Sequence, residues 1–190
     1  LRVIALFTSY NMGLFAIITM TPLYLRANHD LSWMATAITL AAMLLPGALL
    51  QPWMGKISDS VGRRPLIIFG NAMAAGAAFV AWLPSIFALS LIALGVALTV
   101  LVAIRAVVLA AAVDYSGGRE GTSLGLTFAF MDGFAASAAV LAGLAGENDL
   151  ANAFLLASGF SLVAVIVAVA TPKSARATAG TAATGQHVTR

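Results

Sequence analysis

Six long apolar runs follow one another along this chain, leaving almost no polar surface with which a soluble core could be covered. The runs span residues 3–25, 31–54, 66–83, 86–113, 122–145 and 150–170. A helix needs about 20 apolar residues to cross roughly 30 Å of hydrocarbon, and each run approaches or exceeds that length. Only 9% of the residues are charged and the mean hydropathy is +0.99. The sequence therefore predicts an all-α membrane protein with six transmembrane helices.

The end of the chain has a different composition. From Pro172 onward the sequence is polar, basic and rich in Thr, Ala and Gly, which is typical of disordered segments. We therefore expect residues 1–171 to form a six-helix transmembrane bundle and residues 172–190 to form a disordered cytoplasmic tail. The chain contains no cysteine, which excludes disulfides and thiolate chemistry.

Lysine and arginine are distributed unequally between the two sides of the predicted bundle. Six crossings place both termini on one side, and this side carries eight of the ten basic residues: Arg2, Lys56, Arg63, Arg64, Arg119, Lys173, Arg176 and Arg190. The other side carries only Arg26, while Arg105 lies within an apolar run. Because cytoplasmic connections collect this excess, we expect both termini in the cytoplasm of a cell carrying the protein in its plasma or bacterial inner membrane.

The connection between the second and third runs is unusually rich in charge and glycine. It reads QPWMGKISDSVGRRPLIIFG over residues 51–70. Its three basic residues are enough to orient the chain, so a purely topological role is one interpretation. Orientation does not require Gly55, which allows close backbone approach, or Gly62, which permits a turn with positive φ. Asp59 lies four residues before Arg63, within pairing distance if this segment is helical.

The stretch from Gly55 to Arg64, GKISDSVGRR, resembles the motif between the second and third helices of the major facilitator superfamily. The shared pattern is a Gly, an Asp four residues later and Gly-Arg-Arg three residues beyond; Ser60 stands where a basic residue is common. Residues 118–126 resemble the family's second cytoplasmic connection more weakly. The resemblance implies a conformational latch in which Asp59 meets the positive end of a helix in another half of the transporter and the two arginines hold it there. A carboxylate at a helix N-terminus gains about 0.3–1 kcal/mol.

Transporters of this family consist of two six-helix halves, each built from two inverted three-helix repeats, with the site between them near the bilayer midplane. The resemblance therefore implies one half-bundle that works by alternating access against a second half, from the same longer chain or from a homodimer. The polar tail favours the C-terminal half. The implied function is secondary active transport of a small molecule, coupled to protons by symport or antiport, with efflux favoured over uptake.

Two charged residues lie inside the apolar runs, where a charge costs roughly 2.5–3.5 kcal/mol on insertion scales. Arg105 lies nine residues before Asp114, so we place it about 13 Å from the cytoplasmic end of its helix. Asp132 lies eleven residues after Gly121, about 16 Å deep on the next helix. We expect Arg105 and Asp132 to face a water-filled cavity or each other, with Asp132 as a proton-coupling or substrate-binding residue. The alternatives are an ion pair that only locks the two helices, or an arginine that extends towards the membrane surface.

Weaker polar and small-residue patterns occur elsewhere in the runs. Tyr10 and Asn11 lie in the middle third of the first run and are candidates for hydrogen bonds to a substrate, or equally for hydrogen bonds between helices. Two pairs of small residues at four-residue spacing, Ala72 with Gly76 and Ala139 with Gly143, predict helix-packing seams.

Other functional classes fit poorly. Residues 121–125 match the G-x-S-x-G pattern of serine hydrolases, but the pattern requires a preceding strand and a nearby histidine, and the histidines are at positions 29 and 187. We therefore predict no enzyme, no cofactor, no metal and no nucleic-acid partner. A six-helix oligomeric channel or a non-transport membrane protein is the alternative to a transporter.

Overall fold

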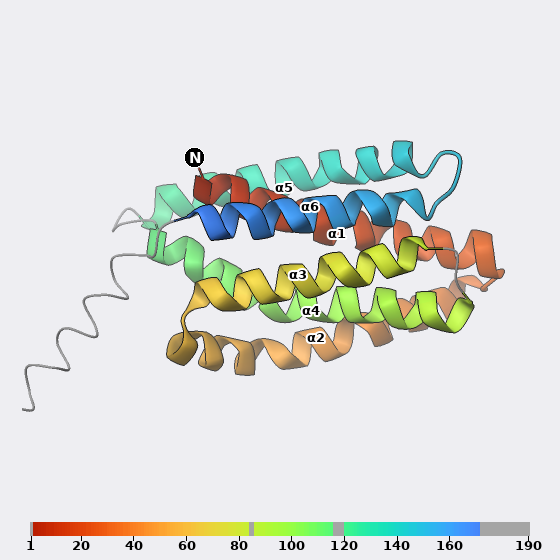
Figure 1. Cartoon of the computed structure of the whole chain (residues 1–190), viewed down its shortest axis with the longest axis horizontal. Coiled ribbons are helices and arrows are strands. Elements are labelled where there is room, and N and C mark those ends of the chain that lie inside the picture. Colours follow the sequence, from red (N-terminus) through yellow and green to blue (C-terminus); the bar gives the residue numbers. More distant parts are fainter. Residues whose placement is uncertain (1, 84–85, 116–119, 172–190) are drawn as a thin grey trace, which may run out of the picture.

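The structure is a computed structural model that describes residues 2–83, 86–115 and 120–171. Within these residues it contains six α-helices: α1 (Arg2–His29), α2 (Trp33–Val61), α3 (Arg63–Trp82), α4 (Phe87–Tyr115), α5 (Glu120–Ala145) and α6 (Asn152–Ala170). The helices lie side by side in one elongated bundle, each running opposite to the one before it (Figure 1). All six are long and apolar enough to cross a membrane, as predicted. Helices suit this environment because they satisfy their own backbone hydrogen bonds.

Several helices extend beyond the apolar runs that predicted them. α1 continues through Arg26 to His29, and α2 continues through the motif to Val61. Residues 55–61, predicted as a connection, are therefore helical, and only Gly62 separates α2 from α3. Hydropathy marks the part of a helix that lies in hydrocarbon, whereas the helix itself continues until a residue interrupts its backbone. The predicted tail, residues 172–190, and residues 116–119 with Arg119 lie outside the described residues.

Helices of each three-helix repeat, α1–α3 and α4–α6, pack mainly against helices of the other repeat. α2 packs against α4 of the other repeat, and correspondingly α5 packs against α1. α3 lies against α4 and α6, and α6 lies against α1 and α3. In contrast, α1 with α2, α2 with α3 and α4 with α5 have limited contact. Corresponding helices thus have corresponding partners, which is the arrangement of two inverted repeats.

Glycines allow the closest approaches between the repeats. A Cβ atom on Gly47 of α2 would lie 2.5 Å from the carbonyl oxygen of Thr99 on α4. Gly13 of α1 faces Ser161 of α6, and Gly70 of α3 faces α4, each with no room for a Cβ atom beside an unmoved neighbour. Small residues let helix backbones pack closely where hydrocarbon surrounds the protein.

The small-residue pairs predicted from the sequence do not form these seams. A Cβ atom on Gly76 or Gly143 would meet nothing within 4 Å. The prediction was wrong because four-residue spacing puts two small residues on one helix face but does not say whether that face points into the bundle.

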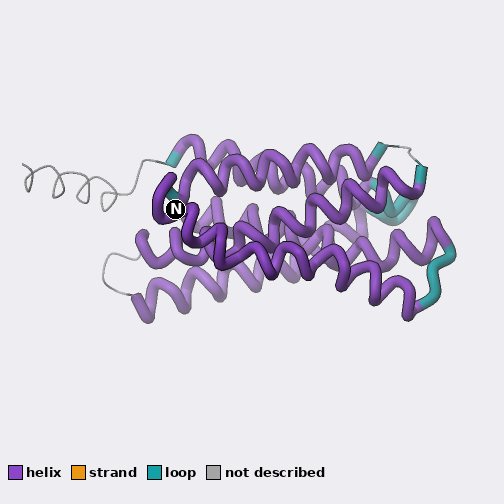
Figure 2. Tube along the Cα trace, turned by 90° about the horizontal axis from the view of Figure 1, so that it is seen from below, coloured by secondary structure: helices purple, strands orange, loops and turns teal. Residues whose placement is uncertain are grey.

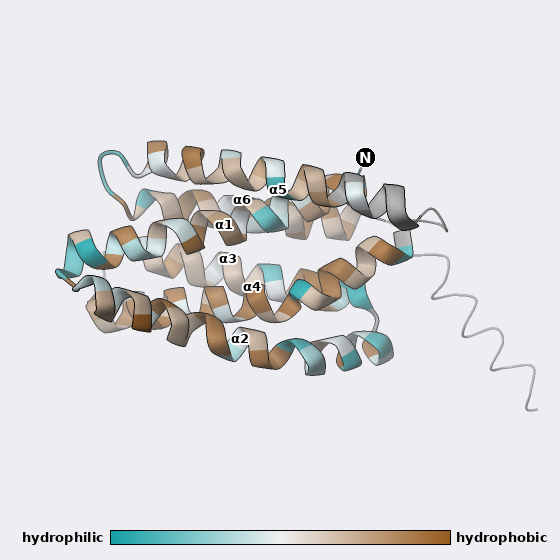
Figure 3. Ribbon diagram, turned by 180° about the vertical axis from the view of Figure 1, so that it is seen from behind, coloured by the Kyte–Doolittle hydropathy of each residue, from teal (hydrophilic) through white to brown (hydrophobic). Residues whose placement is uncertain are grey.

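Many large apolar side chains are exposed on the outside of the bundle, and polar residues lie mostly towards the two ends of the helices (Figure 3). We call the end that holds the start of α1, the α2–α3 connection and the end of α4 the motif end, and the opposite end the far end (Figure 2). α1 buries 56% of its apolar span inside the bundle, whereas α2 buries 17% and α5 buries 22%. These two helices therefore offer the most surface to lipid or to a further partner.

Candidate functional site

Two adjacent polar residues of α1 link it to α4 and to α5. Tyr10 and Asn11 are buried, and successive helix residues point about 100° apart. The Tyr10 hydroxyl donates a hydrogen bond of 2.7 Å to the carbonyl oxygen of Leu101 on α4. Asn11 Nδ2 donates one of 2.9 Å to the carbonyl oxygen of Met131 on α5. The two side chains thus make hydrogen bonds between helices, and in this conformation neither is open to a substrate.

Arg105 lies one helical turn beyond Leu101 on α4. Its side chain is half-buried, and its guanidinium interacts electrostatically with the Tyr10 hydroxyl. Among the hydrogen bonds and ion pairs of the described residues, none involves Arg105. A cation with so few partners in a spanning segment can bind an anionic group that enters from outside the bundle.

Asp132 follows Met131 on α5, and its side chain is exposed on the surface of the bundle. It forms no ion pair with Arg105 in the described structure, because α1 lies between α4 and α5 and contacts both. The predicted locking ion pair is therefore absent, and so is the arrangement in which Arg105 and Asp132 face each other. Since α5 runs from Glu120 to Ala145, Asp132 stands close to the middle of the helix.

Some buried polar side-chain atoms of the described structure have no hydrogen-bond partner. Buried side-chain atoms without a partner in the described structure include Thr8 Oγ1, Asn11 Oδ1, Asn71 Oδ1 and Ser161 Oγ. Unpartnered polar atoms are costly, and water commonly satisfies such atoms in membrane and soluble proteins alike. Asn71 and Ser161 were not singled out from the sequence, although each is a polar residue inside an apolar run, the same signal that identified Tyr10 and Asn11.

At the motif end, Arg63 joins α3 to the end of α4. Its NH1 atom lies 2.7 Å from Asp114 Oδ2 and also donates to the carbonyl oxygen of Ala110. Both charged side chains are about three-quarters buried, with exposed fractions of 26% and 27%. A cation here is doubly favoured, since it pairs with a carboxylate and meets the negative end of a helix. Sequence analysis missed Asp114 as a partner; the available signal was an acidic residue ending a spanning helix on the side that carries the arginines.

Arg64 makes the equivalent connection to α6. Its Nε atom donates a hydrogen bond of 2.9 Å to the carbonyl oxygen of Ala168, and NH2 donates to that of Val169. Arg2 donates from α1 to the carbonyl oxygen of Ala170, at 3.1 Å. These arginines satisfy carbonyl groups that the last turn of a helix leaves without partners. The motif thus fastens α3 to the C-terminal ends of α4 and α6.

Asp59 is loosely held by comparison. Its carboxylate lies 3.9 Å from Arg63, and its side chain is 72% exposed. Arg63 is therefore held mainly by Asp114, and in the described structure Arg64 is bonded to α6 rather than to Asp59. This exposure leaves Asp59 free to meet a group outside the bundle.

The structure agrees with the backbone prediction for one of the two motif glycines, Gly62, and not for the other, Gly55. Gly62 has φ of +94°, so the predicted positive φ is confirmed, and this conformation is what allows the chain to reverse within one residue. The predicted close backbone approach at Gly55 is wrong within this bundle, because a Cβ atom there would meet nothing within 4 Å.

Comparison with known proteins agrees with this architecture. The family model described as the Major Facilitator Superfamily matches residues 2–189. No curated protein and no solved structure matches the chain. The match covers nearly the whole chain, including six helices that are long and apolar enough to span a membrane, so the protein is an integral membrane protein. The chain belongs to the Major Facilitator Superfamily, a family of membrane transporters.

Proposed function

We propose that this chain is one six-helix half of a secondary active transporter that moves a small molecule by alternating access, with proton coupling through Asp132. The half works against a second half around a central site. Small amphipathic molecules fit better as substrates than sugars or organic acids, since the least buried helices, α2 and α5, carry mainly apolar exposed side chains. We favour their export slightly over uptake.

The observation that carries this proposal is the exposure of Asp132 halfway along a spanning helix. A carboxylate facing lipid at that depth is costly, so such residues face water-filled cavities or other protein. Its position on α5, one of the two helices with most free surface, supports placing the transport cavity or the second half against this face.

Proton coupling follows from the cost of a charge in a water-poor surrounding. Carboxylic acids in general ionise more readily in a water-filled cavity than in a closed, water-poor one, which makes Asp132 the candidate for the group that carries the proton. If the proton and the substrate replace each other at Asp132, the cavity closes only when one of the two is bound there, and this requirement couples their movements. Arg105 of α4, which interacts electrostatically with Tyr10 of α1, supplies a positive charge at a similar depth to Asp132. This charge can attract an anionic group of the substrate.

We place the motif end in the cytoplasm. Of the basic residues that the structure describes outside the spanning middle, Arg2, Lys56, Arg63 and Arg64 lie at the motif end and Arg26 lies at the far end. This asymmetry is the one that the positive-inside rule associates with cytoplasmic connections.

The exposed Asp59 is the candidate for contact with the second half. In this role its carboxylate stabilises one conformation by meeting the positive end of a helix there, a gain of about 0.3–1 kcal/mol or more when partly buried. Asp59→Asn should therefore shift the balance between inward-open and outward-open states. The shift is measured by the reactivity of single cysteines placed at either side; an unchanged pattern of reactivity contradicts the latch.

The proposal is tested by Asp132→Asn in the native full-length protein, reconstituted into liposomes. We expect the variant to lose uptake of a fluorescent amphipathic zwitterion driven by a proton gradient, while it retains exchange of labelled for unlabelled zwitterion without a gradient. Asp132→Glu should recover part of the driven flux, and Asp30→Asn at the far end is the matched control with unchanged flux. Full proton-driven flux in Asp132→Asn overturns the coupling proposal, and an ion conductance without saturation favours an oligomeric channel.

A further inference from the structure

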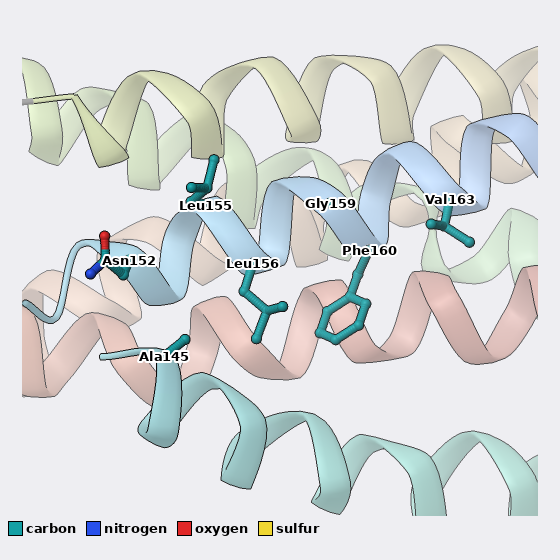
Figure 4. Close-up of a pocket in the computed structure, with 7 residues that line it drawn as sticks. All are labelled: Ala145, Asn152, Leu155, Leu156, Gly159, Phe160 and Val163. Carbon is teal, nitrogen blue, oxygen red and sulfur yellow. The ribbon is translucent and has the colours of Figure 1, made fainter. Parts of the chain in front are cut away.

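A groove of about 550 Å³ runs along α6 from the far end towards mid-membrane (Figure 4). Its lining includes Leu156, Gly159, Phe160 and Val163 of α6, and Ala145 at the end of α5. Asn152 supplies a polar side chain at its far-end limit. A Cβ atom on Gly159 would meet nothing within 4 Å, so the groove is open at that point.

The length of this groove matches one leaflet of a bilayer. The eleven helical steps from Asn152 to Val163 cover about 16 Å at a rise of about 1.5 Å per step. Half of a hydrocarbon core is about 15 Å thick. An apolar slot of this length, beginning at the level of the helix ends, has the dimensions of a single extended acyl chain.

A second cavity, of about 780 Å³, lies at the far end itself and shares Asn152 with the groove. Its walls include the aromatic rings of Tyr24 and Trp82 and the side chains of His29 and Asp149. The shared residue places this mixed polar and aromatic cavity at the head of the apolar groove. Together the two have the polarity of an amphiphile, with a polar head and a long chain.

The polar groups of the cavity are arranged for a head that carries both charges. Asp149 Oδ1 accepts a hydrogen bond of 2.9 Å from the backbone N–H of Ala151, which leaves its second oxygen to accept from a cation. Asn152 Oδ1 accepts from Trp82 Nε1 at 3.2 Å, which leaves its NH₂ group to donate to an anion. Asn28, which also lines the cavity, carries a second such amide.

Arg26, which is close in sequence to Asn28 and His29 of the cavity lining, does not itself line the cavity. The guanidinium of Arg26 lies 3.2 Å from the centre of the Trp33 ring, and neither residue lines the cavity. Asp149 therefore has no basic side chain in its cavity to neutralise it, apart from His29 when that residue is protonated.

We propose that this site binds a membrane phospholipid with an ethanolamine head group, taken from the leaflet at the far end. The acyl chain occupies the groove along α6, the primary ammonium donates to Asp149, and the phosphate accepts from the amides of Asn28 and Asn152. A primary ammonium fits better than a choline group because it can donate hydrogen bonds to a carboxylate. The site is separate from Asp132 and Arg105 and does not depend on the transport mechanism proposed above.

The test uses Trp82 as a reporter in the full-length protein. Trp33→Phe and Trp53→Phe leave Trp82 as the reporter from this chain, and any tryptophan in another part of the protein is likewise replaced by Phe. Vesicles contain choline lipid mixed with ethanolamine, choline or glycerol lipid brominated near the head of the acyl chain, since bromine quenches nearby tryptophan. We expect Trp82 to favour the brominated ethanolamine lipid about fivefold over the choline lipid, the size of effect given by one partly exposed charged pair.

Three variants and one further reporter position separate a specific site from ordinary surrounding lipid. Asp149→Asn should reduce the preference to about onefold, whereas Glu147→Gln, which removes an equal charge outside the cavity lining, should leave it unchanged. Gly159→Leu should fill the groove and also abolish the preference. A protein with Trp53 as the reporter, near the motif end, should show no preference. Equal quenching of Trp82 by the three lipids, or a preference that survives Asp149→Asn, overturns the proposal.

Discussion

The link between Arg63 and Asp114 should stabilise the bundle far more than the link between Arg63 and Asp59, although both carboxylates lie near the same guanidinium. The first pair is separated by 2.7 Å with both side chains about three-quarters buried; the second is separated by 3.9 Å and Asp59 is 72% exposed. At an effective dielectric constant of about 20, charges 2.7 Å apart attract by roughly 6 kcal/mol before desolvation is subtracted. The net value for a charged hydrogen bond is about 1.5–3 kcal/mol, whereas an exposed pair gives about 0–1 kcal/mol.

We therefore expect Asp114→Asn to lower the free energy of unfolding by about 2 kcal/mol and Asp59→Asn to lower it by less than about 0.5 kcal/mol. The measurement is reversible unfolding in mixed detergent micelles. Arg63→Gln alone and combined with each asparagine variant completes two double-mutant cycles, which isolate the two pairwise terms from the loss of the Ala110 hydrogen bond.

Two results contradict this difference between the pairs: Asp59→Asn as destabilising as Asp114→Asn, or a coupling energy between Arg63 and Asp114 close to zero. The first result would mean that the motif is held together mainly by Asp59. The second would mean that desolvation cancels the attraction of the buried pair.

Three further predictions concern packing, the backbone and an interhelical hydrogen bond. Gly47→Ala should destabilise the protein by about 1–3 kcal/mol because its Cβ would lie 2.5 Å from the carbonyl oxygen of Thr99. Gly76→Ala is its control in the same unfolding assay and should be neutral or stabilising, because its Cβ would meet nothing within 4 Å. Gly62→Ala should cost about 1–3 kcal/mol because φ is +94°, and thermal denaturation of the purified protein should show it. Tyr10→Phe should cost about 1 kcal/mol by removing one buried interhelical hydrogen bond, measured against wild type by unfolding in micelles.

The number and type of the helices could be predicted because the bilayer imposes one length and one polarity on every spanning segment. The same constraint does not fix where a helix ends outside the hydrocarbon. α2 continues to Val61 because residues 55–61, although largely polar, contain no proline, and Gly55 alone does not end the helix, which stops at Gly62 with its positive φ.

The candidate site could be predicted in its residue types but not in its pairings. Arg105 and Asp132 stand out as charges in apolar runs, and their depths match, which suggested that they could meet. They are on α4 and α5, and the insertion of α1 between these helices is a property of the exchanged repeats that no local pattern records. For the same reason the sequence offered Asp59 as a partner for Arg63 and did not indicate Asp114, which lies nearer to it in the structure.

The most direct test of the account is the access of water to the face of α5 that carries Asp132. The chain contains no cysteine, and Ala136, one turn beyond Asp132, is exposed, so Ala136→Cys provides a reporter in a full-length protein otherwise free of cysteine. Ile166→Cys on α6, also exposed, is the control for a lipid-facing position. We predict that a membrane-impermeant thiol reagent reacts with the cysteine at position 136 from either side of the membrane and does not react at position 166. Adding Asp59→Asn should increase the reaction at position 136 from one side and decrease it from the other. No reaction at position 136 from either side would contradict the account, because it would place Asp132 against lipid or tightly packed protein.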